Sequence, residues 1–204
     1  MPEKPAYGPK GLKKWQLREP QTIGDYGIFA VKRSLLHDPE GKPKRDVHTF
    51  HVRDWCNVVP VTADGRVLLV WQYRFGTGEF SLELPGGVID AGEDPMTAAI
   101  RELEEESGAV SPRVELMSIL EPNPALQGNK LYSYVAWEID IAQAHEKTKF
   151  DELEELESLL VPIRDLPELL DEGVIKHALC TTVLETFLRR HAHWKATAQS
   201  GKGP

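Results

Sequence analysis

The fold is decided by one stretch of the sequence, Gly87–Ala109, which reads GVIDAGEDPMTAAIRELEEESGA. Asp94 belongs to the residue types preferred at a helix N-cap, and Pro95 suits the first helical position. Gly108 suits the left-handed residue that ends many helices. These signals predict an α-helix over about residues 95–107.

The predicted helix gathers carboxylates on one side. An α-helix advances about 100° per residue, so Glu102, Glu105 and Glu106 fall within an arc of roughly 100°. Like charges at this spacing destabilise a helix by roughly 0.2–0.5 kcal/mol per pair, and a bound cation relieves that repulsion. For an isolated glutamate run, a solvated acidic face is the usual alternative. The fixed spacing to Gly87 and Arg101 favours a metal site, and oxygen ligands favour Mg²⁺ or Mn²⁺ over zinc.

The spacing resembles the signature of the Nudix hydrolases: a glycine, five residues, a glutamate, seven residues, then Arg-Glu-aliphatic-x-Glu-Glu-x-Gly. Ala109 stands where a larger aliphatic residue is usual. The resemblance covers most of residues 50–192 and implies an α/β fold, the Nudix-type α/β/α sandwich with a mixed sheet, and cleavage of a diphosphate bond. It implies metal ligation, with Mg²⁺ as the cofactor and Mn²⁺ able to replace it, by Glu102, Glu105, Glu106 and the backbone carbonyl of Gly86.

The catalytic roles are divided between the helix and a later loop. Arg101 lies four residues before Glu105 and can orient its carboxylate, although an ordinary surface ion pair is the alternative. The resemblance points to the acidic loop 151–155 for the general base. Glu152 matches the base, and Glu154 matches an additional catalytic and metal contact. A merely solvated acidic loop is the alternative there.

Candidates for substrate binding lie outside the signature. Arg74 follows a strand that reads as buried and can bind a phosphate bidentately, and the resemblance supports an arginine in a Gln-x-Arg triplet there. Phe29 and Trp55 can stack on a base, although aromatic residues at such positions more often belong to the core. Glu83 and Gln127 complete the set of expected substrate contacts.

Two further features bear on the substrate. Pro124 follows Ala109 by fifteen residues and resembles the marker of ADP-ribose pyrophosphatases. The segment 121–129 lacks the Pro-Gly-x-Ser/Thr-x-Glu run common in close members of that branch. We therefore expect a tolerant pocket that accepts nucleoside diphosphate sugars of the ADP-ribose and GDP-mannose type. The alternatives are hydrolysis of dinucleoside polyphosphates or of another diphosphate, and a non-catalytic module that senses ADP-ribose.

Composition limits the number of domains. With 204 residues and 41% hydrophobic residues, the chain can bury one good core and a small appended subdomain. We expect an N-terminal arm with a small antiparallel β subdomain over 1–55, a Nudix domain over 56–194 and a flexible tail over 195–204. The resemblance implies that the N-terminal subdomain contributes to base binding and exchanges between the two subunits of a homodimer.

Charge and hydropathy limit the partners and the compartment. The net charge of −8 and the absence of a long Lys/Arg run argue against a nucleic-acid partner. No apolar run reaches the roughly 18 residues of a membrane span. Cys56 and Cys180 lie in apolar surroundings and fit buried free thiols, which favours the cytoplasm.

Hydrophobic alternation and turn residues place the remaining elements. The strands are expected at 26–36, 47–55, 58–62, 66–74, 80–84, 114–120, 131–141 and 156–163, with further helices from Asp165 and over about 175–191.

Overall fold

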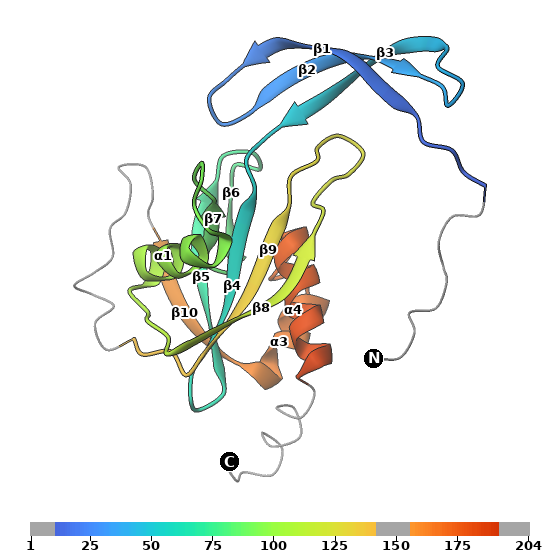
Figure 1. Cartoon of the computed structure of the whole chain (residues 1–204). Coiled ribbons are helices and arrows are strands. Elements are labelled where there is room, and N and C mark those ends of the chain that lie inside the picture. Colours follow the sequence, from blue (N-terminus) through green and yellow to red (C-terminus); the bar gives the residue numbers. More distant parts are fainter. Residues whose placement is uncertain (1–10, 142–155, 192–204) are drawn as a thin grey trace. The chain divides into compact units, whose positions relative to one another are not determined.

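The computed structural model describes residues 11–141 and 156–191 (Figure 1). The chain forms two compact units. One comprises Met1–Val52 with Asn123–Gly128, and the other comprises Arg53–Pro122 with Asn129–Pro204. The predicted domain limits at 55 and 194 stay a prediction.

The first unit is a three-stranded antiparallel sheet of β1 (Gln16–Asp25), β2 (Ala30–His37) and β3 (Pro43–His51), in that order across the sheet. The antiparallel N-terminal sheet was predicted, but β1 was not. Nearly every residue of β1 is exposed, and its sequence carries a proline and several charged residues. It therefore lacks the regular apolar alternation by which a strand is recognised.

The second unit is built on a seven-stranded mixed sheet. Its central path runs β10-β5-β4-β9-β8, and the only parallel pairing among the described strands joins β4 to β9. The short strand β7 pairs with the start of β4, and β6 pairs with β5. The strands are β4 (Trp55–Val61), β5 (Arg66–Arg74), β6 (Glu79–Glu83), β7 (Gly86–Val88), β8 (Arg113–Leu120), β9 (Leu131–Trp137) and β10 (Leu156–Pro162).

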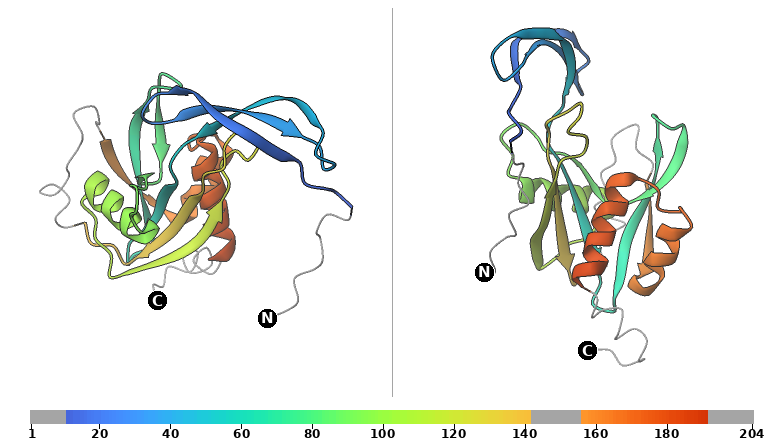
Figure 2. Two further views of the ribbon diagram at one scale, coloured as in Figure 1. Left: turned by 45° about the horizontal axis from the view of Figure 1, so that its top comes forward. Right: turned by 90° about the vertical axis from the view of Figure 1, so that its right-hand side faces the viewer.

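Helices cover both faces of this sheet, as Figures 1 and 2 show. On one face, α1 (Pro95–Ser107) packs its Ala98, Ala99 and Leu103 against β4 residues such as Val58. The other face is covered by the short helices η1 (Ile163–Asp165) and α3 (Leu166–Asp171) and by α4 (Ala178–Arg190). The α/β/α sandwich with a mixed sheet is therefore confirmed.

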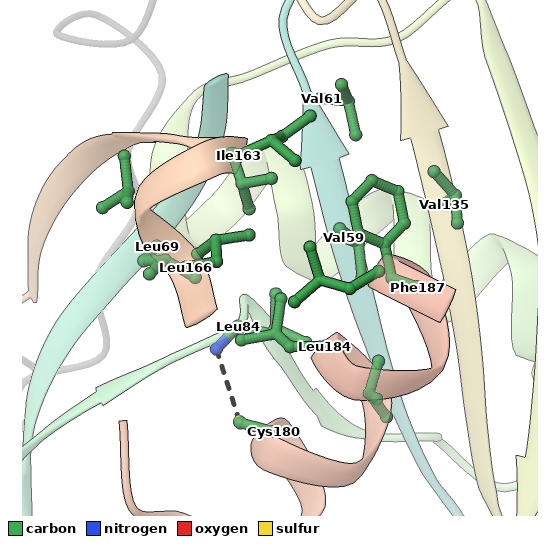
Figure 3. Close-up of a cluster of buried hydrophobic side chains, with 14 of the residues drawn as sticks. Val59, Val61, Leu69, Leu84, Val135, Ile163, Leu166, Cys180, Leu184 and Phe187 are labelled. Carbon is green, nitrogen blue, oxygen red and sulfur yellow. Dashed lines mark hydrogen bonds between the residues drawn. The ribbon is translucent and has the colours of Figure 1, made fainter. Parts of the chain in front are cut away.

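The larger core cluster lies under α3 and α4 (Figure 3). Phe187 of α4 is fully buried and packs near Trp137 of β9, with ring centroids 6.2 Å apart. At the other end of α4, the Leu84 backbone N–H donates to Cys180 Sγ at 3.4 Å. The apolar side chains of α4 thus belong to the core, and they anchor the first turn of this helix beside the end of β6.

The ends of α1 match the prediction because capping chemistry is local. Asp94 accepts hydrogen bonds from the backbone N–H groups of Met96 and Thr97, and Gly108 has a φ of 66°. Only a residue without a Cβ adopts that conformation at little cost. The two caps fix where the helix begins and ends. They thereby decide which of its side chains face the sheet and which, such as those of Glu102 and Glu105, lie on its other side.

Two further predictions concern the thiols and the helices. Cys56 and Cys180 are buried free cysteines, as predicted. Burial raises the pKa of the Cys56 thiol to about 11 and that of the Cys180 thiol to about 12. Both thiols are protonated near neutral pH and are poor nucleophiles. Within residues 11–141 and 156–191, no helix is long and apolar enough to cross a bilayer.

Replacing Phe187 by alanine tests the core under α4. We expect the free energy of unfolding to fall by about 3–5 kcal/mol, because the substitution leaves a cavity that the sheet and helix cannot close. Chemical denaturation measures this loss. Phe75→Ala is the matched control, since Phe75 is 77% exposed, and its effect should stay within about 1 kcal/mol. Equal losses in the two variants would contradict this account of the core.

Candidate active site

The central contact of the α1 surface is a guanidinium that holds three carboxylates. Arg101 Nη1 donates to Glu102 Oε1 and to Glu105 Oε2, both at 2.9 Å. Its Nε and Nη2 donate to the two carboxylate oxygens of Glu93, at 3.0 and 3.1 Å. One positive charge thus faces three negative charges. The arrangement orients the carboxylates and leaves these four side chains with an excess of negative charge.

The pKa shifts follow from these contacts. Hydrogen bonding to Glu93, followed by that to Glu105, raises the pKa of Arg101 against the opposing effect of burial. The hydrogen bond from Arg101 lowers the pKa of the Glu93 carboxyl, and the Asp90 backbone N–H lowers it further. Arg101 and Glu93 are therefore both charged at neutral pH.

Two glycines bring the chain into contact with the glutamates of α1. The Gly86 backbone N–H donates to Glu106 Oε2 at 2.9 Å, and Glu106 is 7% exposed. A Cβ on Gly87 would lie 2.5 Å from Glu102 Oε1, so only glycine leaves room for that carboxylate. Carboxylate oxygens of Glu106 and Glu102 thus lie beside Gly86 and Gly87, and oxygen is the ligand type that Mg²⁺ and similar hard cations prefer.

Gly86 and Gly87 also line a pocket of about 740 Å³. Its walls come from β4, β6, β7 and the start of β9, and from the segment Lys176–Cys180 that begins α4. Much of its lining is apolar, including Trp55, Leu84, Leu131 and Leu179. Because Gly86 and Gly87 line the pocket while contacting the glutamates, the pocket and the glutamate cluster adjoin.

Arg74 and Glu83 form a bidentate ion pair in the pocket wall. Arg74 Nε donates to Glu83 Oε1 at 2.8 Å, and Nη2 donates to Oε2 at 2.6 Å. Burial raises the pKa of the Glu83 carboxyl, but the hydrogen bonds and charge of Arg74 outweigh burial, so the net pKa is lowered. Glu83 therefore stays ionised and fixes the Arg74 side chain, which lies at the pocket with its Nη1 outside this pair.

His177 and Cys180 lie next to Glu83. One ligand atom from each of these three residues lies within 4.8 Å of the others, a grouping that can be considered for a metal. Both oxygens of Glu83 are already occupied by Arg74, and burial raises the pKa of Cys180 to about 12. A cation would have to displace the guanidinium and deprotonate the thiol. Carboxylate oxygens alone, such as those of α1, suit a hard cation better than this mixed set of ligand types.

The expected site residues divide into three groups. Trp55, Arg74, Glu83 and Gly86 line the pocket beside the α1 glutamates and Arg101. Phe29 and Gln127 belong to the unit with the three-stranded sheet: Phe29 packs against Tyr26 and Phe50, and Gln127 bridges to Phe50. Glu152 and Glu154 lie outside the described residues. Their roles stay predictions.

Sequence reasoning missed Asn57 and His177. Asn57 stands inside the apolar run WCNVVPV of β4, where no local motif marks it, and His177 precedes α4 without a capping hydrogen bond from its side chain. Both line the pocket. A polar residue inside an apolar strand was the only available signal.

Comparisons with known proteins fit this geometry. The family described as NUDIX domain matches residues 51–181. An ADP-ribose pyrophosphatase from Bacillus subtilis is 29% identical over 165 residues, covering 78% of this chain and 88% of that protein. Putative nudix hydrolase 2 from Caenorhabditis elegans is 56% identical over 92 residues, covering 36% of this chain and 41% of that protein. The crystal structure of an ADP compounds hydrolase superposes with a TM-score of 0.76 at 25% identity, covering 89% of this chain and 97% of that one.

Gly87→Ala tests the contact between β7 and α1. The new methyl group displaces the Glu102 carboxylate rather than backbone, so we expect a folded protein whose affinity for Mn²⁺ falls at least about tenfold, roughly 1.4 kcal/mol. Calorimetric titration measures the affinity. Gly128→Ala is the control, because a Cβ there meets nothing within 4 Å. Unchanged Mn²⁺ affinity in Gly87→Ala would show that Glu102 needs no close approach to Gly87.

Proposed function

Since the chain belongs to the Nudix hydrolases, we propose that it hydrolyses the diphosphate bond of nucleoside diphosphate sugars of the ADP-ribose and GDP-mannose type. Water adds across the P–O–P linkage, and the products are a nucleoside monophosphate and a sugar phosphate. One observation carries the proposal: the glutamate cluster of α1 adjoins a pocket of about 740 Å³ through Gly86 and Gly87. The names of the relatives, ADP-ribose pyrophosphatase and ADP compounds hydrolase, support the substrate class.

We propose Mg²⁺ as the cofactor, with Mn²⁺ able to replace it, held by Glu102, Glu105, Glu106 and the Gly86 carbonyl. A bound divalent cation neutralises the diphosphate oxygens and lowers the pKa of an attacking water. The excess of carboxylate over guanidinium charge among Arg101 and its partners supports a cation at this place. Arg101 acts as a positioning residue, because its donors hold the carboxylates of Glu102 and Glu105, while the Gly86 N–H holds that of Glu106.

The remaining roles are proposals of the same kind. Arg74, fixed by Glu83, presents Nη1 for a phosphate oxygen of the substrate. Trp55 offers an aromatic ring in the pocket lining. Glu152 is proposed as the general base, with Glu154 as a further metal contact. Unchanged turnover in both Glu152→Gln and Glu154→Gln would place the base elsewhere.

We also propose a homodimer in which the three-stranded sheet and its Phe29 and Gln127 serve base binding. The apolar side chains that this unit leaves exposed support a partner surface, since large exposed apolar patches mark interaction sites. They include Trp15, Leu17, Ile23, Tyr26 and Ile28. Sedimentation that shows only monomer at micromolar concentration would contradict the dimer. The two buried free thiols support cytoplasmic residence.

A substrate panel tests the activity. Phosphate release, coupled to a phosphatase, is measured for ADP-ribose, GDP-mannose, UDP-glucose and diadenosine polyphosphates, with Mg²⁺ and with a chelator. We expect Mg²⁺-dependent turnover of the sugar nucleotides. Preference for the diadenosine compounds would make the chain a dinucleoside polyphosphate hydrolase, and binding of ADP-ribose without turnover would make it a sensor.

Glu106→Gln tests the metal assignment. Replacing this carboxylate by its neutral isostere should lower turnover at least about 100-fold, because several kcal/mol of charge stabilisation depend on the cation it helps to hold. The Gly86 N–H keeps an acceptor in the amide oxygen, so the melting temperature should change little. Glu104→Gln makes the same chemical change on the same helix and should keep turnover within about twofold. Near-normal activity of Glu106→Gln would overturn the assignment.

A further inference from the structure

Three side chains of different ligand types converge where the end of β6 meets the start of α4. One ligand atom each from Glu83, His177 and Cys180 lies within 4.8 Å of the other two. Glu83 Oε2 and His177 Nδ1 are 3.9 Å apart. Ligand atoms of a tetrahedral zinc ion stand roughly 3.3–3.8 Å from one another. The three atoms therefore need to close in by about 1 Å at most to hold one ion.

The histidine nitrogen is turned toward this group and away from solvent. His177 Nδ1 is inaccessible to solvent and has no hydrogen-bond partner in the described part of the chain. In the tautomer with its hydrogen on Nε2, Nδ1 keeps the lone pair that a metal ligand needs. Ligand atoms that face one another are typical of a closed zinc site. The His177 side chain is 37% exposed, so rotation of its ring opens a path from the pocket for an ion.

The backbone supports a thiolate at Cys180. The Leu84 N–H donates to Sγ at 3.4 Å (Figure 3). Burial is the larger effect and raises the pKa of the thiol to about 12, although this hydrogen bond lowers it. A cation reverses the balance, because a thiol that coordinates a metal ion is deprotonated outright.

Binding requires Arg74 to release one oxygen of Glu83. Arg74 Nη2 donates to Oε2, while Nε donates to Oε1. The Arg74 side chain is 43% exposed, so water can solvate the freed Nη2 while the second hydrogen bond persists. The two positive charges that the cation adds are met by the Glu83 carboxylate and by the new thiolate of Cys180, whose proton leaves to solvent.

The set of ligands selects the class of cation. Carboxylate, imidazole and thiolate together fit Zn²⁺, whereas Mg²⁺ prefers oxygen alone. With three protein ligands, a fourth position stays open to water. The glutamates of α1 and this mixed group therefore suit cations of different classes.

We propose that Glu83, His177 and Cys180 form a second metal site, which binds Zn²⁺ or a similar thiophilic cation. Its occupation loosens Arg74, the proposed phosphate contact, and so lowers the affinity for substrate. The site itself stands on its own geometry, and its effect on substrate rests on the proposed function. Zn²⁺ thus acts as an inhibitor at a place separate from the α1 glutamates.

A Co²⁺ titration tests the site without any substrate. Co²⁺ binds the same ligand types as Zn²⁺ less tightly, and a thiolate ligand gives it an intense charge-transfer band in the near ultraviolet. The titration is run with excess Mg²⁺, to occupy the proposed site on α1, and with a reductant that carries no thiol. We expect a saturable band in the wild type. Its midpoint should move to lower Co²⁺ concentration as the pH rises, because the thiol must lose its proton.

Three variants assign the band to its ligands. Cys180→Ser removes the thiolate but keeps an acceptor for the Leu84 N–H, and it should abolish the band. His177→Gln should weaken Co²⁺ binding at least about tenfold, a loss usual even for residues that only support a ligand. Cys56→Ser is the matched control, because Cys56 is the other buried free thiol of the pocket lining, and it should keep the band. A band that is absent in the wild type, survives Cys180→Ser or needs Cys56 overturns the site, as does unchanged Co²⁺ binding in His177→Gln.

Steady-state kinetics with ADP-ribose test the effect on substrate. With Mg²⁺ in excess, micromolar Zn²⁺ should raise KM at least about fivefold in the wild type and in Cys56→Ser, and should leave KM unchanged in Cys180→Ser. Equal inhibition of the wild type and Cys180→Ser would overturn the inhibitory role, because Zn²⁺ would then act at the α1 glutamates. If the wild type cleaves none of the sugar nucleotides but shows the Co²⁺ band, the hydrolase proposal fails and the metal site stands.

Discussion

The candidate site depends on one electrostatic constraint, the grouping of Glu93 and two glutamates of α1 around a single guanidinium. Arg101 contacts Glu93, Glu102 and Glu105 at hydrogen-bond distance. Without it, carboxylates three and four residues apart would repel and disperse into solvent. With it, their orientation is fixed while negative charge remains in excess. The same contact therefore orders the carboxylates that we propose as metal ligands, Glu102 and Glu105.

A steric constraint joins this surface to the pocket. The glutamates belong to α1, which covers one face of the sheet, whereas the pocket is bounded by the start of α4, which covers the other. Gly86 and Gly87 of β7 line the pocket and also lie against Glu106 and Glu102. Substrate recognition and bond cleavage can thus be served by different faces of one sheet, with two glycines between them.

Features that depend on residues close together in the chain could be predicted from the sequence, whereas features that depend on pairing between separate segments could not. The limits of α1 depend on Asp94 and Gly108 at its own ends, and the prediction of 95–107 is confirmed. The strand 66–74 is likewise confirmed, because its apolar residues are contiguous. The strand β1 lacks such a pattern, and its pairing with β2 is what makes it a strand.

The candidate site shows the same difference between contacts within one helix and contacts between distant elements. The reach from Arg101 to Glu105 is four residues along one helix and was predicted, whereas the contact between Gly86 and Glu106 spans twenty residues and two elements. Asn57 and His177 are 120 residues apart in the chain, and both line the same pocket. No local sequence pattern shows that residues so far apart line one pocket. The composition of the pocket wall therefore could not be predicted from the sequence.

The measurement that tests the central claim most directly is Mn²⁺ binding without nucleotide, followed by electron paramagnetic resonance, in which bound Mn²⁺ loses the signal of the free ion. The wild type should bind Mn²⁺ saturably, and a Glu102→Gln, Glu106→Gln double variant with an unchanged melting temperature should not. Saturable binding of equal strength in both proteins, or none in the wild type, would contradict the claim that the glutamates of α1 form a metal site.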